Sequence, residues 1–192
     1  MGMAQSMYHY MGEAWKQPDK EVMKTRLVQW RAGNSFTVVD KPLRIDKARA
    51  LGYKAKKGFV VVRVRLLRGG RQRSRHTHGR KSRKQHVRKI LKMNYRWVAE
   101  QRAEKRFGNL VVLNSYPIGK DGKNNFFEVI MVDPHKPEIM NDKDINWICV
   151  PGNQKRAIRG LTSAAKKSRG MRSKSHSMKV RPSLRSWDRR GK

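Results

Sequence analysis

The residues of this chain that could do chemistry are cations without local counter-charge. The stretch from Leu66 to Lys84, LLRGGRQRSRHTHGRKSRK, contains no acidic residue, and none occurs anywhere between Asp46 and Glu100. Arginine guanidinium groups bind phosphate oxygens through paired hydrogen bonds, and each phosphate that Lys or Arg neutralises releases condensed counterions. This stretch therefore predicts binding to a polyanion with dense phosphate charge.

Two glycines, Gly69 and Gly70, interrupt the cations of this loop. Because glycine has no Cβ, the backbone can turn there and bring its N–H groups close to a phosphate, while the flanking arginines reach neighbouring oxygens. A plain flexible hairpin end is the alternative interpretation. The candidate phosphate ligands of the loop are Arg68, Arg71, Arg73, Arg75, Arg80, Lys81, Arg83 and Lys84.

The composition of the whole chain supports the same partner. Its 192 residues include 47 Lys and Arg against 14 Asp and Glu, so the formal net charge is +33, and such a chain repels itself without a polyanion. Hydrophobic residues make up 37%, which favours a folded centre with basic arms over full disorder. Aromatic residues are sparse in the basic stretches, and no zinc-finger spacing or recognition-helix motif occurs. We therefore expect structured RNA, bound by shape and phosphate, rather than single strands or DNA.

A strand must carry the chain into the basic loop. From Gly58 the apolar period changes to two, so that alternate residues up to Leu66 form one apolar face and Arg63 and Arg65 lie on the other. We interpret both arginines as candidate phosphate ligands. A half-buried edge strand with solvated arginines is the alternative.

Helices are predicted before this strand and after the loop. The spacing predicts helices over 7–15 and 20–31, the second capped by Asp19, and together they form an N-terminal helical arm over residues 1–34. The arm should bury its aromatic stripe against the core. A long helix is expected over 87–107, with Gly108 as its terminator.

Two strands and a tail complete the chain. NLVVLNSYPI and NNFFEVIMVD read as strands joined by a turn at Asp121 and Gly122, so a small α+β core over residues 35–150 carries the basic loop at 68–86. Residues 151–192 are short of apolar side chains and predict a basic extended tail with one short helix near 162–169, capped by Thr162.

Metal and cofactor sites are weakly indicated. His76, His78 and His86 lie in or near the basic loop, but no fourth ligand closes a site and the surrounding positive charge opposes a cation. The single cysteine, Cys149, permits no internal disulfide or thiolate cage and is expected to be a buried structural thiol. We expect no cofactor, and Mg²⁺ only through the RNA itself.

An RNA-processing enzyme stays open as an alternative. Asp133 lies close to His135, but no serine or cysteine occupies a nucleophile elbow. Glu100 and Glu104 lie one helical turn apart and could form a carboxylate pair, although we expect both on a solvated face, where Arg96 pairs with Glu100.

A membrane anchor is a second alternative. MGMAQS matches the pattern for myristoylation of Gly2, and a lipid with a polybasic tail would supply two membrane signals. A first helix that docks inward explains the same residues. The apolar stretches fall far short of the roughly 20 residues that a spanning helix needs. We expect a soluble protein that binds no membrane and forms no homo-oligomer.

Several segments, in order, are familiar. DKARALGYKAKKGFVVVRVRLLRGG, VLNSYPIGKDG, FFEVIMVDP, NWI and RGLTSAAKKSRGM resemble the archaeal and eukaryotic large-subunit ribosomal protein family L-fifteen-e, which is distinct from the bacterial protein of that number. MYHYMGEAW and RPSLRSWDRRGK resemble its archaeal type, and the match covers nearly the whole chain. The departures from the family pattern are Lys57, Pro117, Lys120, Lys136 and Ala165.

The resemblance implies a structural protein of the large ribosomal subunit that supports translation in the cytoplasm, without catalysis. It implies a four-stranded, mostly antiparallel sheet, covering helices and long extensions, packed against ribosomal RNA and neighbouring ribosomal proteins. Tyr53 then packs on a ribose or base, or fills the core. The RNA-facing residues that it implies are Lys47, Arg49, Lys54, Lys56 and Lys57 before the strand, Arg68, Arg71, Arg73 and Arg75 after it, and Arg156, Arg159, Lys166, Lys167, Arg169, Arg181 and Arg185 in the tail, to which the charge of the tail adds Arg172.

Overall fold

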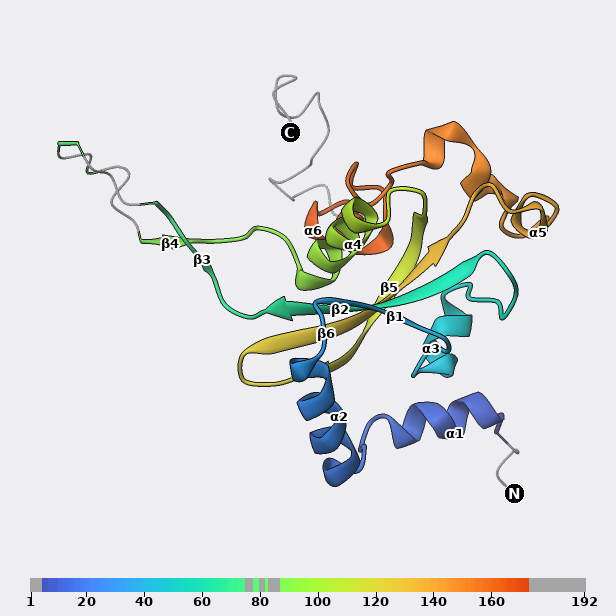
Figure 1. The fold of residues 1–192 in the computed structure, drawn as a ribbon, viewed down its shortest axis with the longest axis horizontal. Helices are drawn as coiled ribbons and strands as arrows, with labels where there is room; N and C mark the ends of the chain where they lie inside the picture. The colour runs from blue at the N-terminus through green and yellow to red at the C-terminus, as the bar shows by residue number, and fades with distance from the viewer. Residues whose placement is uncertain (1–4, 75–77, 80–81, 83–86, 173–192) are drawn as a thin grey trace.

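A four-stranded antiparallel sheet lies at the centre of the molecule. The computed structural model describes residues 5–74, 78–79, 82 and 87–172. The sheet order is β1-β2-β6-β5, which confirms the predicted α+β fold and its four strands (Figure 1). The strands are β1 (Phe36–Val39), β2 (Phe59–Leu67), β5 (Val111–Lys120) and β6 (Asn124–Val132).

Helices cover both faces of this sheet (Figure 1). The first three precede β2 in sequence, whereas the longest helix after β2 packs on β5. The helices are α1 (Met7–Ala14), α2 (Lys20–Ala32), α3 (Ile45–Ala50), α4 (Tyr95–Arg106), α5 (Pro137–Met140) and α6 (Ser163–Ser168), with short 3₁₀ turns η2 (Asn146–Cys149) and η3 (Pro151–Asn153).

The predicted apolar face of β2 is the centre of one core cluster. Val62, Val64 and Leu66 are at most 1% exposed and pack with Ala99 and Ala103 of α4. β2 is an inner strand, because β6 pairs with it along its whole length and β1 pairs with Val61–Val64 on its other side. The edge-strand alternative is therefore wrong.

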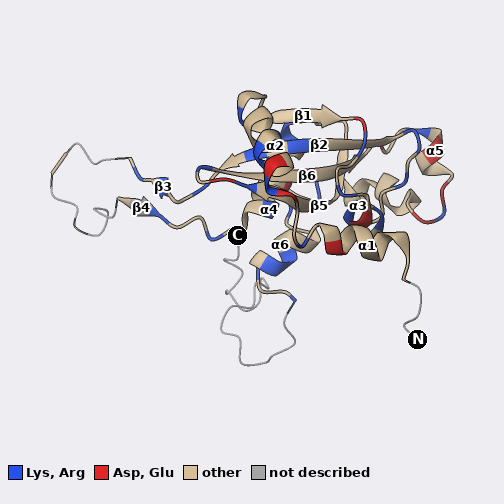
Figure 2. Ribbon diagram, turned by 90° about the horizontal axis from the view of Figure 1, so that it is seen from below, with Lys and Arg blue, Asp and Glu red and all other residues tan. Residues whose placement is uncertain are grey.

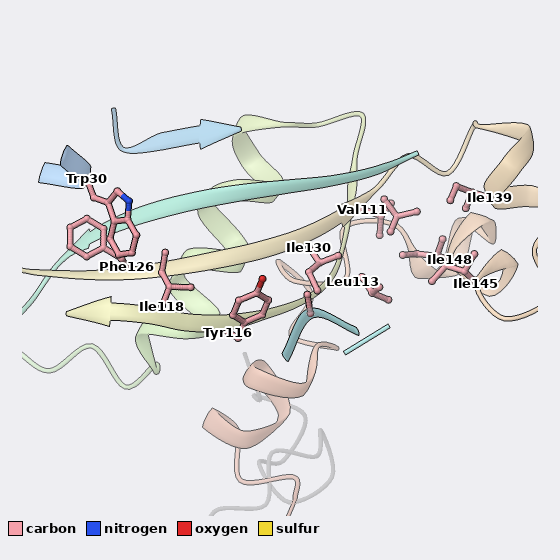
Figure 3. Close-up of a cluster of buried hydrophobic side chains, with 12 residues drawn as sticks. Trp30, Val111, Leu113, Tyr116, Ile118, Phe126, Ile130, Ile139, Ile145 and Ile148 are labelled. Atoms are coloured by element: carbon pink, nitrogen blue, oxygen red, sulfur yellow. The ribbon is translucent and has the colours of Figure 1, made fainter. Parts of the chain in front are cut away.

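The opposite face of the sheet carries a second cluster. Trp30 of α2 packs on Phe126 with ring centroids 5.3 Å apart, and Tyr116, Ile130 and Ile148 continue the cluster along the sheet (Figure 3). The sheet is thus the middle layer of the fold, since both of its faces are buried against helices or loops.

The N-terminal helices form as predicted, but only one of them is buried. Ser6 caps α1 and Asp19 caps α2, where an Asp19 oxygen accepts from the Glu21 N–H at 2.8 Å. Trp30 at the end of α2 is 5% exposed, whereas the stripe of α1 is only half-buried at Tyr8 and Trp15 and α1 has no fully buried residue. The prediction that the arm packs its stripe inward is therefore confirmed for α2 and holds only in part for α1.

The long helix predicted over 87–107 begins only at Tyr95. Lys92 has a left-handed φ of 52°, and the Asn94 side chain accepts from the Trp97 N–H at 2.7 Å, which starts the helix there. The apolar side chains before Asn94 do contact the core, but they lie in an irregular segment. The spacing of apolar residues alone does not distinguish such a segment from a helix. The helix ends at Arg106, with Phe107 as its C-cap, one residue before the predicted end.

The basic loop has an ordered base that the sequence analysis did not predict. β3 (Arg71–Gln72) and β4 (Arg88–Lys89) pair to form a hairpin that projects from the sheet (Figure 1). Gly69 has a left-handed φ of +91°, as expected of a turn. The Tyr95 hydroxyl binds the backbone of this residue, because it accepts from the Gly69 N–H at 2.7 Å and donates to the Gly69 carbonyl at 3.1 Å. The first residue of α4 therefore positions the hairpin.

The core extends beyond residue 150, where the tail was expected to begin. Ala157 and Ala165 are fully buried, and α6 forms as predicted, with Thr162 accepting from the Ala165 N–H at 3.3 Å. Ala157 packs in the α4 cluster. Segment 151–172 is therefore part of the fold, because it packs against elements that are distant in sequence.

Replacing Gly58 by alanine is expected to lower the free energy of unfolding by about 2–4 kcal/mol. Gly58 has a φ of +92°, and an added Cβ would lie 2.6 Å from the buried Ile139 side chain. Gly52 is the matched control, because its φ is +95° but its Cβ would meet only Leu113, at 3.4 Å. Urea unfolding followed by circular dichroism measures both changes. Equal losses in the two variants would contradict the steric part of this prediction.

Candidate nucleic-acid interface

The hairpin and α6 carry positive side chains and no negative ones. Lys and Arg lie on β3, β4 and α6, where Figure 2 shows no acidic residue. Glu100, Glu104 and Glu128 are buried, and a further acidic group follows β6, at 138–144. The hairpin and α6 therefore present positive charge that is not compensated locally.

The hairpin carries its cations outward. Arg73 is exposed and Arg71 is half-buried, and neither guanidinium group has a hydrogen-bond partner among the described residues. Arg68 is also exposed and donates one hydrogen bond to the Asp121 carbonyl at 2.6 Å, which ties the base of the hairpin to the β5–β6 turn. The other predicted ligands of the loop, Arg75, Arg80, Lys81, Arg83 and Lys84, lie outside the described residues.

α6 adds a second group of cations beside the start of α4. The Asn94 N–H donates to Ser168 Oγ and its side-chain amide donates to the Ala164 carbonyl, both at 2.9 Å. This contact places Lys166 and Lys167, exposed in the last turn of α6, near the exposed Lys92. Sequence reasoning missed Lys92 because it lay inside the predicted helix. Arg181 and Arg185 lie outside the described residues.

The predicted cations before β2 differ in their surroundings. Lys47 and Lys57 are exposed and have no side-chain partner in the described part of the chain. Arg49 is exposed as well, but its guanidinium group stacks on Tyr8 at 5.5 Å from the ring centroid and donates to the Tyr8 hydroxyl. Lys47 and Lys57 are therefore available to a phosphate without the loss of an internal contact.

Lys54 and Lys56 are paired with carboxylates. Lys54 Nζ lies 2.9 Å from Asp142 and 2.7 Å from Asp144, and Lys56 also donates to Asp142. Hydrogen bonds from Lys56 and Lys54 lower the pKa of Asp142, and hydrogen bonds to Asp144 and Asp142 raise the pKa of Lys54. A phosphate at this place would have to compete with Asp142.

Asp142→Asn is expected to make the protein less sensitive to acid. The pKa of Asp142 is lower in the folded chain than its ordinary value of 3.8. Between the two values the unfolded chain binds more protons, so this contribution to stability is complete above about pH 5 and is lost as the pH falls below about 4. The urea midpoint should therefore fall less between pH 5 and pH 3 in the variant than in the parent. An equal fall of the urea midpoint in the variant and the parent would contradict this role of Asp142.

Several predicted phosphate ligands support the protein itself. Arg63 stacks on Trp30 at 5.3 Å, and Arg65 donates to the Arg31 carbonyl. Burial of its guanidinium group lowers the pKa of Arg63. Both arginines lie on the face of β2 opposite to the apolar one, as predicted. Their interpretation as phosphate ligands stays a prediction.

The arginines after β6 also bind backbone carbonyls. Arg156 donates to Leu113 at 3.0 Å and Val112 at 3.2 Å and stacks on Trp147. Arg159 and Arg169 donate to carbonyls of residues 152, 154 and 160, and Arg172 donates to the Ser163 hydroxyl. These side chains hold the segment 151–172 in place.

Glu100 is buried, contrary to the prediction of a solvated face. Its carboxylate accepts from the hydroxyls of Ser115 and Thr162, each at 2.5 Å, and Arg96 Nε lies 3.9 Å away. Burial raises the pKa of Glu100. A helix can turn this polar side chain inward because Ser115 and Thr162, on two other elements, supply the donors.

The other predicted carboxylates also have structural contacts. Glu104, 4% exposed, accepts from the Ile158 N–H at 2.9 Å, so it too was wrongly expected on a solvated face. Asp133 accepts from the backbone N–H of His135 at 3.0 Å, which is a turn rather than a catalytic contact. Tyr53 packs on Phe59, with ring centroids 5.8 Å apart, which supports its core interpretation.

The metal, thiol and membrane hypotheses concern few described residues. No group of three or more His, Cys, Asp or Glu that could hold a metal occurs among them. His76, His86 and Gly2 lie outside them. Cys149 is half-buried rather than buried, and its partial burial raises the pKa of the thiol. Within the same residues, no helix has both the length and the apolar character that crossing a membrane requires.

Comparisons with known proteins agree over nearly the whole chain. Residues 6–187 match the model of the protein family described as Ribosomal L15. A protein of Methanospirillum hungatei, named large ribosomal subunit protein eL15, is 48% identical over 99% of this chain and 100% of its own length. A protein of the same name from Methanocella arvoryzae is 46% identical, with the same coverage of both chains.

Proposed function

The chain belongs to the Ribosomal L15 family, and from this premise we propose that it is a structural constituent of the large ribosomal subunit that binds folded ribosomal RNA. The observation that carries this proposal is the uncompensated positive charge of the β3–β4 hairpin and α6. A +33 chain of this size neutralises many phosphates. The protein holds RNA segments in place and so supports translation.

The mechanism is charge compensation combined with shape. Ordering a flexible segment costs roughly 1–2 kcal/mol of backbone entropy per residue, so a long arm becomes fixed only where it makes many charge-assisted contacts together. The sheet and its helices supply a rigid body, and the Tyr95–Gly69 contacts fix the direction in which the hairpin leaves it. The hairpin then enters the RNA at a defined angle.

The phosphate ligands that we propose fall into two groups. The described cations without an internal partner act directly on phosphates, and those with internal contacts mainly shape the surface that presents them. The first group contains Lys47, Lys57, Arg71, Arg73, Lys166 and Lys167; the second contains Arg49, Lys54, Lys56, Arg63, Arg65, Arg68, Arg156, Arg159, Arg169 and Arg172.

The partners follow from this assignment. The protein associates with ribosomal RNA and neighbouring proteins of the large subunit, in the ribosome of the cytoplasm. We propose that it acts as a single copy without membrane contact, and that it needs no cofactor beyond ions held by the RNA. We propose no catalysis by its side chains, since Glu100, Glu104 and Asp133 serve internal hydrogen bonds.

Sedimentation of cell extracts tests the proposed function. A tagged full-length chain, expressed in a methanogenic archaeon, is expected to move with the large subunit in a sucrose gradient and to leave that fraction after ribonuclease treatment. A chain that stays at the top of the gradient, or that moves with membranes, would contradict the proposal.

A further inference from the structure

A pocket of about 360 Å³ opens at the end of α4 that faces away from the hairpin. The first residue of α4 contacts the hairpin, whereas Lys105 in its last turn lines the pocket together with Gly108. The remaining lining comes from the start of β5, the turn after β6 and the segment 154–158. Four separate parts of the chain therefore meet around this space.

The lining of the pocket is partly apolar and its rim is positive. Ile158, 39% exposed, offers the main apolar surface on which a flat ring can pack, and the largely buried Leu110, Val111 and Pro134 lie behind it. Lys105 and Lys155 are exposed at its edge. The pocket thus combines the features of a binding site for an apolar ring that carries an anion.

Lys155 has an unusual backbone conformation. Its φ is 50°, one of two left-handed values among the described residues other than glycine. A side chain in this region costs free energy and persists where the surrounding structure enforces it, which is most frequent at functional sites. The segment 154–158 keeps this conformation while Ile158 donates its N–H to Glu104 at 2.9 Å.

Glu104 lines the pocket and has a hydrogen-bond acceptor that no described residue satisfies. One carboxylate oxygen accepts from Ile158, and the other, Oε1, is buried without a partner in the described part of the chain. A free inorganic anion would be repelled by this carboxylate, and a purely apolar ligand would leave the lysines unused. A ring with N–H donors can donate to the carboxylate, and a phosphate attached to that ring can bind the lysines. A nucleotide is such a ligand.

We propose that this pocket binds one unstacked nucleotide of ribosomal RNA, with its base against the apolar walls and its phosphate at Lys105 and Lys155. The inference rests on the proposed function, which brings RNA to the protein, and adds a site that recognises a single extruded base. Such recognition requires that the base leave its stack, so the site selects a bulged or looped nucleotide. Glu104 favours a base with an amino group.

A photocrosslink placed at the pocket tests the site. Gln154 is exposed and lines it, so it is replaced by the photoreactive residue p-benzoylphenylalanine in the tagged full-length chain, and large subunits are purified before irradiation. The crosslinks are expected at one ribosomal RNA nucleotide or its immediate neighbour. Crosslinks only to protein, within the chain itself, or to nothing, in subunits that contain the chain, would overturn the inference while the proposed function stands. A chain absent from the subunits would overturn both.

A pocket-filling variant tests occupancy. Gly108→Phe places a ring at a position whose added Cβ meets no atom within 4 Å, and Gly122→Phe does the same in the β5–β6 turn as the control. In subunits with Gly108→Phe, the crosslinked nucleotide is expected to react several-fold more with a 2′-hydroxyl acylating reagent, whereas the control leaves its reactivity unchanged. Unchanged reactivity with Gly108→Phe would overturn the inference.

A charge variant tests the rim separately. Replacing Lys105 and Lys155 by glutamate is expected to raise the reactivity of the same nucleotide. The control replaces Lys136 and Lys143, which are exposed beside α5, and so makes the same change in net charge. An equal response to both pairs would show a general effect of charge and would overturn the assignment of the phosphate to this rim.

Discussion

Replacing Arg68, Arg71, Arg73 and Arg75 by glutamine is expected to weaken the binding of ribosomal RNA strongly and to reduce its salt dependence. Each phosphate contact contributes about 0.7–0.9 to the slope of log K against log salt concentration, so loss of the three contacts of Arg71, Arg73 and Arg75 lowers the slope by about 2–3. At 0.1 M salt the affinity should fall roughly 100-fold or more. The described arginines of this set lie on the acid-free hairpin and its base. Filter binding of the full-length chain to its ribosomal RNA, over a range of salt concentrations, measures the slope.

A matched control separates position from total charge. Lys24, Lys41, Lys136 and Lys143 are exposed and lie outside the hairpin and α6. Their replacement by glutamine removes the same four charges and is expected to change the slope by much less. If both variants lose the same slope, the hairpin has no special role and the chain binds RNA by its net charge alone.

Glu100→Ala is expected to lower the free energy of unfolding by about 3–5 kcal/mol, because it leaves the buried partners of this carboxylate uncompensated. Glu100 joins α4 to Ser115 of β5 and to Thr162, the cap of α6. The positive charges of Arg96 and Arg156 also attract this carboxylate. The change should therefore loosen the segment 151–172 as well as α4. Urea unfolding measures the global loss, and hydrogen exchange of the Ala165 N–H reports α6 separately.

Two further variants test whether the buried network causes this loss. Glu100→Gln keeps an oxygen that can accept a hydrogen bond and is expected to lose less stability than Glu100→Ala. Glu13→Ala removes the exposed partner of Lys16 and should leave the urea midpoint unchanged. A Glu100→Ala variant as stable as the parent would show that the contacts of Glu100 do not hold α6 in place.

Elements with a strong local pattern could be predicted from the sequence. The β5–β6 hairpin, α2 with its Asp19 cap and α6 with its Thr162 cap all form where their residues predict. Each combines a clear period or a short apolar run with a cap or turn residue close in sequence. β1 and the start of α4 were not predicted from the pattern. β1 is short and is held by pairing with β2, and the segment before Asn94 is apolar without being helical.

The class of partner was also determined by the sequence alone, because net charge and the acid-free run from 47 to 99 are sums over residues that no fold can change. Tertiary structure decided which cations remain available. Lys54 meets Asp142, which lies 88 positions away, and Arg63 lies against Trp30, whereas Arg73 and Lys167 keep no such partner in the described chain. A side chain's partners are set by the distances that packing creates between remote segments, and those distances cannot be deduced from the order of residues in the chain.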